Sequence, residues 1–113
     1  PDQEEFRRLL YSQIMQANPD GYRATMRALA LFDVRRRLAE IRAPVLVITG
    51  SLDTTVPPAS QTEMASKIST ARQVVISGAG HAVSVDCPEE FNQALIEFLN
   101  DNGIQNTHQS TSR

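Results

Sequence analysis

The sequence predicts a domain of the α/β class, in which helices cover both faces of a parallel sheet. Two short runs, 45–49 (VLVIT) and 72–77 (RQVVIS), combine apolar and β-branched residues, as parallel strands between helices do. A helical pattern separates these runs, and a second one follows them. Two parallel strands need such a crossover, which is almost always right-handed.

Three helices are expected before the first strand. Apolar residues recur at helical spacing within residues 3–17, namely Phe6, Leu9, Leu10 and Ile14. The sequence NPDG then signals a turn, and Asp20 is the candidate N-cap of a second helix. Asp33 is the candidate N-cap of a short third helix over 33–41.

The second half of the chain alternates strand and helix. After a loop over 51–58, residues 59–68 are expected to be helical, with three residues facing inward: Met64, Ala65 and Ile68. Pro88 suits the first turn of a last helix, whose buried stripe is expected to comprise Phe91, Leu95, Phe98 and Leu99. The polar tail over 103–113 has no periodicity, so we expect it to be disordered and its His108 to be inert.

The number of strands is small for a parallel sheet. Only two are predicted, and parallel sheets with so few strands rarely stand alone. Unpaired strand edges would then be open to other chains. The pattern therefore predicts one edge of a larger α/β sheet, which is completed by a missing N-terminal part of the fold or by self-association.

Composition restricts the classes of function. The 113 residues fit one domain, and the net charge of −2 argues against nucleic acid or an anionic membrane as partner. No apolar run approaches the roughly 20 residues that span a membrane. Cys87 is the only cysteine, which excludes an internal disulfide and fits a reducing compartment such as the cytoplasm. Cysteine and histidine show no metal-ligand spacing, so we expect no metal and no cofactor.

Two polar side chains follow the two strands at equivalent ends. Asp53 lies three residues past Gly50, and His81 lies four residues past Ser77, in the stretch GAGH. Ligands of open α/β sheets bind at the carboxyl ends of the strands. Asp53 would there accept a hydrogen bond from the His81 imidazole and orient it as a general base. The alternative is that both are ordinary turn residues.

The segment from Leu38 to Asp53, followed by Val56-Pro57-Pro58, resembles the pattern L..I..P.LVI.G..D...P of α/β-hydrolase fold enzymes. The stretch GAGH, with DCPEEF shortly after it, resembles the same family's GAGH.....P..F...L..FL. The likeness covers roughly residues 33–100, and it is greatest to the esterase, enol-lactonase and haloperoxidase-like branch.

The resemblance implies a division of roles along the chain. Residues 33–102 would form the C-terminal part of the α/β-hydrolase core, and residues 1–32 the end of a lid over the active site. Asp53 matches the acid and His81 the base of a catalytic triad. A small-molecule acyl substrate would then touch Tyr22, Met26, Leu29, Phe32, Ala82 and Val83. For each of these six residues, packing within the protein is the alternative.

The nucleophile that such a triad needs is absent from the sequence. The family's triad runs serine, acid, histidine, with the serine in G-x-S-x-G, and this motif does not occur here. The elbow pattern is lacking at Ser51, Ser77 and Ser84. Cys87 stands next to a helix start, where a thiol can be activated, but Pro88 follows it and no base is aimed at it, so we interpret it as structural. We therefore expect the C-terminal portion of a serine hydrolase that acts on an ester, lactone or similar acyl bond, a fragment that is inactive alone. The alternative is a non-catalytic module that associates through its exposed strand edges.

Overall fold

The computed structural model describes residues 3–103, which form two compact units. The first unit ends at Val34 and the second begins at Arg35. The predicted tail lies, apart from Gly103, outside the described residues, and His108 lies there with it. Within residues 3–103, no helix is both long enough and apolar enough to cross a membrane.

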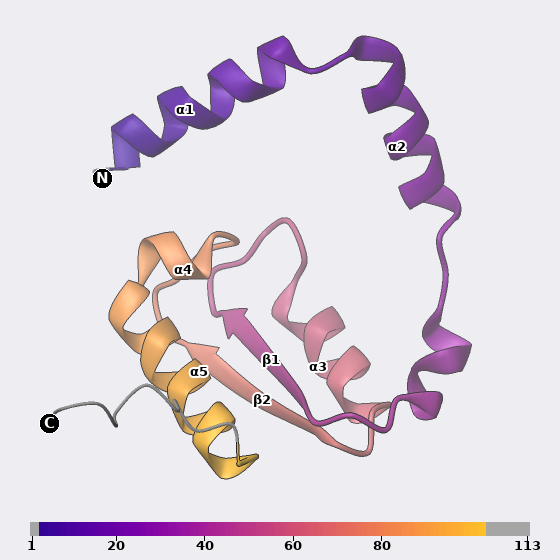
Figure 1. Ribbon diagram of the computed structural model, residues 1–113, viewed down its shortest axis with the longest axis vertical. Helices are drawn as coiled ribbons and strands as arrows, with labels where there is room; N and C mark the ends of the chain where they lie inside the picture. Colours follow the sequence, from indigo (N-terminus) through magenta and orange to yellow (C-terminus); the bar gives the residue numbers. More distant parts are fainter. Residues whose placement is uncertain (1–2, 104–113) are drawn as a thin grey trace, which may run out of the picture. The chain divides into compact units, whose positions relative to one another are not determined.

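The first unit contains two helices, α1 (Gln3–Gln16) and α2 (Pro19–Leu31) (Figure 1). Asn18 caps α2, because its Oδ1 accepts the backbone N–H groups of Asp20 at 2.9 Å and Gly21 at 3.0 Å. The prediction of Asp20 as N-cap is therefore wrong: Pro19 occupies the first helical position, which places Asp20 within the first turn. None of the α2 side chains is buried.

The second unit begins with a 3-10 helix, η1 (Arg35–Glu40), and not with the short α-helix predicted over 33–41. Its last turn closes by a bond over three residues, from the Ile41 N–H to the Leu38 carbonyl at 3.2 Å. Leu38 is the one buried residue of η1. Such tight turns are common in short connectors.

The sheet of the second unit is parallel and has two strands, β1 (Val45–Gly50) and β2 (Ala71–Ile76). The register runs from the pair Val45 and Ala71 to the pair Gly50 and Ile76, so both strands end at the same edge. Helix α3 (Pro58–Ser66) is the crossover between them (Figure 1). The predicted α/β class is confirmed.

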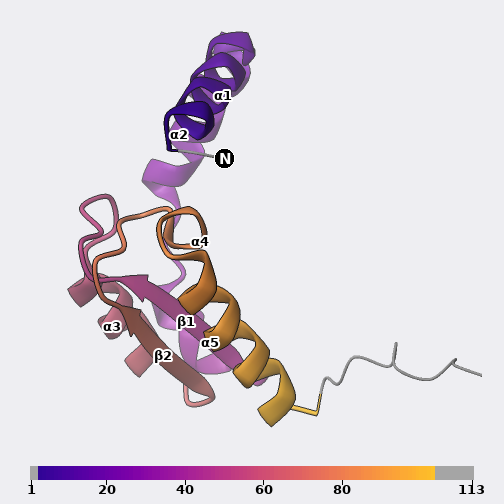
Figure 2. The ribbon, with the colours of Figure 1, turned by 90° about the vertical axis from the view of Figure 1, so that its left-hand side faces the viewer.

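Two helices, α4 (Val83–Asp86) and α5 (Pro88–Asp101), cover the face of the sheet opposite to α3 (Figure 2). The core on this face joins the end of β2 to α4 and α5, and it comprises Ile76, Ala79 and Val83 with Ile48, Val74, Cys87 and Phe91 packed against them. The single turn of α4 is not anticipated from the sequence. Sequential strands and flanking helices thus bring the loops after β1 and β2 to one edge.

The other face of the sheet carries α3, and here one packing prediction is wrong. Met64 was expected to face inward, yet it is 39% exposed, because α3 turns Gln61 and not Met64 toward the sheet. Ile68, which follows the helix, is buried as expected. Thr49 of β1 is buried on this face, where it meets Gln61 of α3.

Candidate active site

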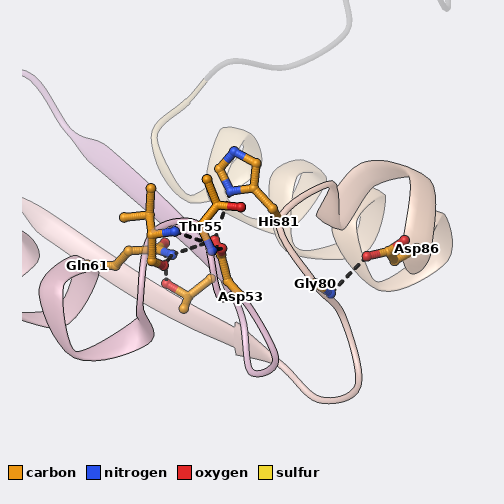
Figure 3. A network of polar contacts seen from close by, with 8 residues as sticks. Asp53, Thr55, Gln61, Gly80, His81 and Asp86 are labelled. Carbon is orange, nitrogen blue, oxygen red and sulfur yellow. Dashed lines mark hydrogen bonds and ion pairs between the residues drawn. The ribbon is translucent and has the colours of Figure 1, made fainter. Parts of the chain in front are cut away.

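Asp53 closes a tight turn directly after β1. One carboxylate oxygen, Oδ1, accepts the backbone N–H groups of Thr55 and Val56, both at 2.9 Å. Aspartate is favoured in turns for bonds of this kind. The interpretation of Asp53 as a turn residue is therefore correct for this oxygen, and the turn leaves the second oxygen free for other partners (Figure 3).

The second oxygen, Oδ2, lies 3.0 Å from Nδ1 of His81, although 28 positions separate the two residues in sequence. It also accepts a hydrogen bond from Nε2 of Gln61 at 3.1 Å. The Asp53 side chain is 4% exposed and that of His81 is 59% exposed. The structure thus places a buried carboxylate behind an imidazole that solvent can reach, and the expected hydrogen bond between them is present.

The surroundings of Asp53 keep its carboxyl group ionised. The hydrogen bond from His81 and then that from the Val56 N–H lower its pKa, against burial, which raises it. An ionised carboxylate only accepts hydrogen bonds, so Nδ1 of His81 carries the hydrogen of the bond between them. In the neutral imidazole, Nε2 is then an acceptor, and it points away from Asp53 (Figure 3). This is the arrangement of a general base.

Backbone contacts hold the two loops together. The carbonyl oxygens of Ile76 and Ala79 accept the N–H groups of Ser51 and Leu52, both at 2.9 Å. The Ser51 hydroxyl in turn accepts the N–H of Gly78 at 2.9 Å. Ser51 is therefore occupied in joining the loops, which agrees with its rejection as a nucleophile.

Gly78 and Asp86 shape the turn that carries His81, and Asp86 was not singled out from the sequence. Gly78 adopts a φ of 80°, a left-handed conformation that glycine tolerates best. Two residues later, the Gly80 N–H donates to Oδ2 of Asp86 at 2.8 Å (Figure 3). The only signal in the sequence was an aspartate six residues past Gly80. Asp86 thus fixes the turn just before His81.

The residues expected to touch substrate are divided between the two units. Val83 is 8% exposed and packs in the core, as the alternative interpretation had it, while Ala82 beside it is half-buried. The other four, which are Tyr22, Met26, Leu29 and Phe32, are exposed residues of the first unit. Apart from Val83, their contact with a substrate stays a prediction.

Cys87 is a free cysteine that packs against the core. Burial, and then the charges of Glu90 and Asp86, raise the pKa of the Cys87 thiol, so it stays protonated at neutral pH. The interpretation of Cys87 as a structural residue is consistent with its packing against the core.

Within the described part of the chain, no group of three or more histidine, cysteine, aspartate or glutamate side chains could hold a metal ion.

Several known proteins that this chain resembles are hydrolases or esterases by name. The chain matches the family described as Alpha/beta hydrolase family over residues 2–94. It is 35% identical over 82 residues to a protein of Caulobacter sp. (strain K31) named "Putative carbamate hydrolase RutD", an alignment that covers 73% of this chain and 31% of the relative. It is 33% identical over 84 residues to the pimeloyl-(acyl-carrier protein) methyl ester esterase of Photobacterium profundum, over 74% of this chain and 33% of the relative. The chain therefore spans about a third of the length of these curated relatives.

Solved structures lead to the same group of proteins. The enol-lactonase from Burkholderia xenovorans LB400 superposes with a TM-score of 0.70 at 26% identity. The superposition covers 88% of this chain and 40% of that one. The superposed part of this chain is therefore longer than the second unit alone.

Proposed function

Because the chain belongs to the alpha/beta hydrolase family, we propose that it supplies the acid and the base of a catalytic triad in a serine hydrolase. Asp53 is the acid and His81 is the base. The observation that carries the proposal is the 3.0 Å contact between Asp53 Oδ2 and His81 Nδ1, which leaves Nε2 exposed as an acceptor.

The proposed chemistry uses His81 twice, once in acylation and once in deacylation, and in each step it accepts one proton and then returns it. His81 Nε2 accepts the hydroxyl proton of a serine while the serine oxygen bonds to the acyl carbon. The imidazolium, stabilised by Asp53, returns the proton to the leaving oxygen as the bond to that oxygen breaks. Water then attacks the acyl carbon while His81 Nε2 accepts its proton; the bond to the serine oxygen breaks, the proton passes to that oxygen, and the carboxylic acid is released. Asp53 stays ionised throughout.

The proposal places the nucleophile and the oxyanion hole outside these 113 residues. In this family the nucleophile precedes the acid in the chain, and one oxyanion donor is the N–H that follows it. Each oxyanion donor contributes roughly 3–4 kcal/mol to catalysis. The chain alone is therefore expected to hydrolyse esters no faster than free imidazole.

We place the substrate in the class of esters, lactones and related acyl compounds. The named relatives support this class, because they are a carbamate hydrolase, a methyl ester esterase and an enol-lactonase by name. Five residues are proposed to contact the acyl substrate: Tyr22, Met26, Leu29, Phe32 and Ala82. We also place the protein in the cytoplasm, a reducing compartment that suits its single thiol.

Two experiments test the proposal. The reading frame of the gene should continue upstream of Pro1 through a G-x-S-x-G, and a frame without that motif would overturn the serine mechanism. The complete gene product should hydrolyse a short-chain p-nitrophenyl ester, and His81→Ala should lower kcat by several orders of magnitude. The matched control is His108→Ala, at the only other histidine of the sequence, which should leave kcat unchanged. A His81→Ala enzyme with normal kcat would exclude His81 as the base.

A second candidate is a non-catalytic module that binds a partner, or another copy of the chain, by its strand edges. The observation in its favour is the two-stranded sheet, since each strand of the described residues pairs along one edge only. A groove also follows β2 and α5, lined by Arg72, Val74, Val75, Ile76, Ser77, Glu90, Gln93, Ala94 and Glu97. An upstream G-x-S-x-G, with ester hydrolysis by the complete gene product, would dismiss this candidate.

A further inference from the structure

We infer that Gln61 is a positioning residue for the Asp53–His81 pair, an inference that rests on the function proposed above. Gln61 lies on α3 and its side chain contacts the Asp53 carboxylate. Its Nε2 donates to Asp53 Oδ2 at 3.1 Å and to the Val56 carbonyl at 2.8 Å. The oxygen that faces His81 is therefore the same oxygen that Gln61 holds (Figure 3).

The orientation of the Gln61 amide is itself fixed. Its Oε1 accepts a hydrogen bond from the Thr49 hydroxyl at 3.0 Å. That hydroxyl, on a residue that is 0% exposed, also accepts a bond from Nε2 of Gln73 at 2.9 Å. Thr49 has a single hydroxyl hydrogen, and it is committed to Gln61.

A flipped amide would be penalised at three points. Oε1 would then face two oxygens, Asp53 Oδ2 and the Val56 carbonyl, and Nε2 would face the Thr49 hydroxyl. Two donor bonds would be lost beside a buried carboxylate, where an unpaired polar group is expensive. The hydrogen bonds from Gln73 to Thr49 and from Thr49 to Gln61 thus direct the NH₂ end of the Gln61 amide, and not its oxygen, toward Asp53.

The consequence concerns geometry at His81. The turn amides hold Oδ1 of Asp53, and Gln61 holds Oδ2, so the carboxylate plane is fixed at both oxygens. With Oδ2 fixed, the His81 ring is held with its Nδ1–H on the carboxylate and Nε2 outward. Without Gln61, the carboxylate gains freedom to rotate and the imidazole gains access to its other tautomer. Partners of this kind around catalytic histidines are typically worth about 10- to 100-fold where they have been measured, chiefly in metal sites.

The alternative is that Gln61 only satisfies the buried hydroxyl of Thr49. Two pairs of variants of the complete gene product separate these roles. Gln61→Met keeps the approximate volume and removes the amide, and Gln61→Glu keeps the shape but replaces the donor with an oxygen. Thr49→Val removes the orienting hydroxyl, whereas Thr49→Ser retains it. Gln93→Glu on α5, where the exposed amide bonds Glu97, is the control for the charge change.

The kinetic readout is kcat and KM for p-nitrophenyl acetate per folded enzyme. We expect both Gln61 variants to lower kcat about 10- to 100-fold, with KM changed less than about twofold. Thr49→Val should lower kcat less, and Thr49→Ser and Gln93→Glu should retain it. A purely structural role predicts a lower melting temperature with normal kcat in the folded fraction, and that result would overturn the inference.

A second readout does not need turnover. Ring ¹⁵N chemical shifts of His81 at about pH 9, where imidazole is neutral, report which nitrogen carries the hydrogen. We expect the Nδ1–H tautomer in the wild type and a mixture of tautomers in Gln61→Met. An unchanged tautomer in that variant overturns the role of Gln61. Absence of ester hydrolysis in the wild type, with the tautomer shift present, overturns the proposed function and supports the positioning role.

Discussion

Gly50 lies against the backbone of Gly80, so closely that Gly50 could not carry a side chain without displacing the turn that holds Gly80. A Cβ placed on Gly50 would lie 2.5 Å from the Ala79 carbonyl oxygen, and closer still to that of Gly80. Gly50 is the last residue of β1, and Gly80 directly precedes His81. This contact brings the loop of Asp53 against the turn of His81.

Gly50→Ala is therefore expected to destabilise the protein. The added methyl group must push the 78–81 turn away from β1, and overpacking of this kind costs about 1–3 kcal/mol. Thermal unfolding of the complete gene product measures the loss. The control is Gly21→Ala, where the new Cβ would lie 3.8 Å from Asn18 in ordinary contact, so the helix should gain rather than lose stability. An unchanged melting temperature for Gly50→Ala would show that the turn is not held by this contact.

Asp53→Asn is expected to lower kcat by as much as about 10⁴-fold, as in triads whose histidine is held in the wrong tautomer. The asparagine amide must point either its oxygen or its NH₂ group at His81. The backbone N–H groups of Thr55 and Val56 require an acceptor oxygen at the position of Oδ1. The NH₂ group of the asparagine then takes the position of Oδ2 and faces His81 Nδ1. Kinetics with a p-nitrophenyl ester measure the effect, and near-normal kcat would mean that Asp53 is only a turn residue.

Asp53 also predicts how stability depends on pH. Its pKa in the folded protein is below the ordinary value of 3.8, first because of the hydrogen bond from His81. A carboxyl group with a lowered folded-state pKa stabilises the fold fully above its ordinary pKa, and this contribution is lost as pH falls through the lower, folded-state pKa. Denaturant unfolding between about pH 2 and 7 should therefore show a steeper acid loss in the wild type than in Asp53→Asn. Parallel curves for wild type and Asp53→Asn would contradict the prediction.

The strands and the acid–base pair were predictable because both depend on short-range patterns. The β-branched runs at 45–49 and 72–77 mark the strands: β1 extends one residue beyond its run, and β2 begins and ends one residue before its run. Parallel strands with a helix between them must end at the same edge, so Asp53 and His81 had to approach one another. The residue types then left little choice of chemistry.

The residues that refine the site were not predictable by the same route. Gln61 bonds Asp53 eight positions away and Asp86 bonds Gly80 six positions away, in each case between a helix and a loop, so no helical or strand spacing links either pair. Glutamine on a helix is also ordinarily a solvated residue. Only the rotation of α3 about its axis, set by packing on the sheet, turns Gln61 inward and Met64 outward. That rotation depends on contacts with β1 and β2, which helical spacing in so short a segment does not determine.

The 113-residue chain by itself is expected to self-associate. Within the described residues, its two strands have unpaired outer edges, and both α1 and α2 expose large apolar side chains. Such edges and surfaces favour contact with other chains. Sedimentation velocity should therefore show oligomers or aggregates whose size increases with concentration. A clean monomer with a sharp cooperative melt would count against the interpretation of the chain as part of a larger sheet.

Two substitutions of Asp86 can separate the effect of its hydrogen bond from the effect of its charge. Its Oδ2 accepts the Gly80 N–H at 2.8 Å, and Gly80 is half-buried. Asp86→Ala leaves that donor without its partner, which costs about 1–3 kcal/mol and should loosen the turn before His81. Asp86→Asn keeps an acceptor oxygen at the same position, so it should retain most of the stability and most of kcat. If only the charge near His81 matters, the two variants will behave alike in melting temperature and ester hydrolysis. If the bond matters, only the alanine variant will lose both.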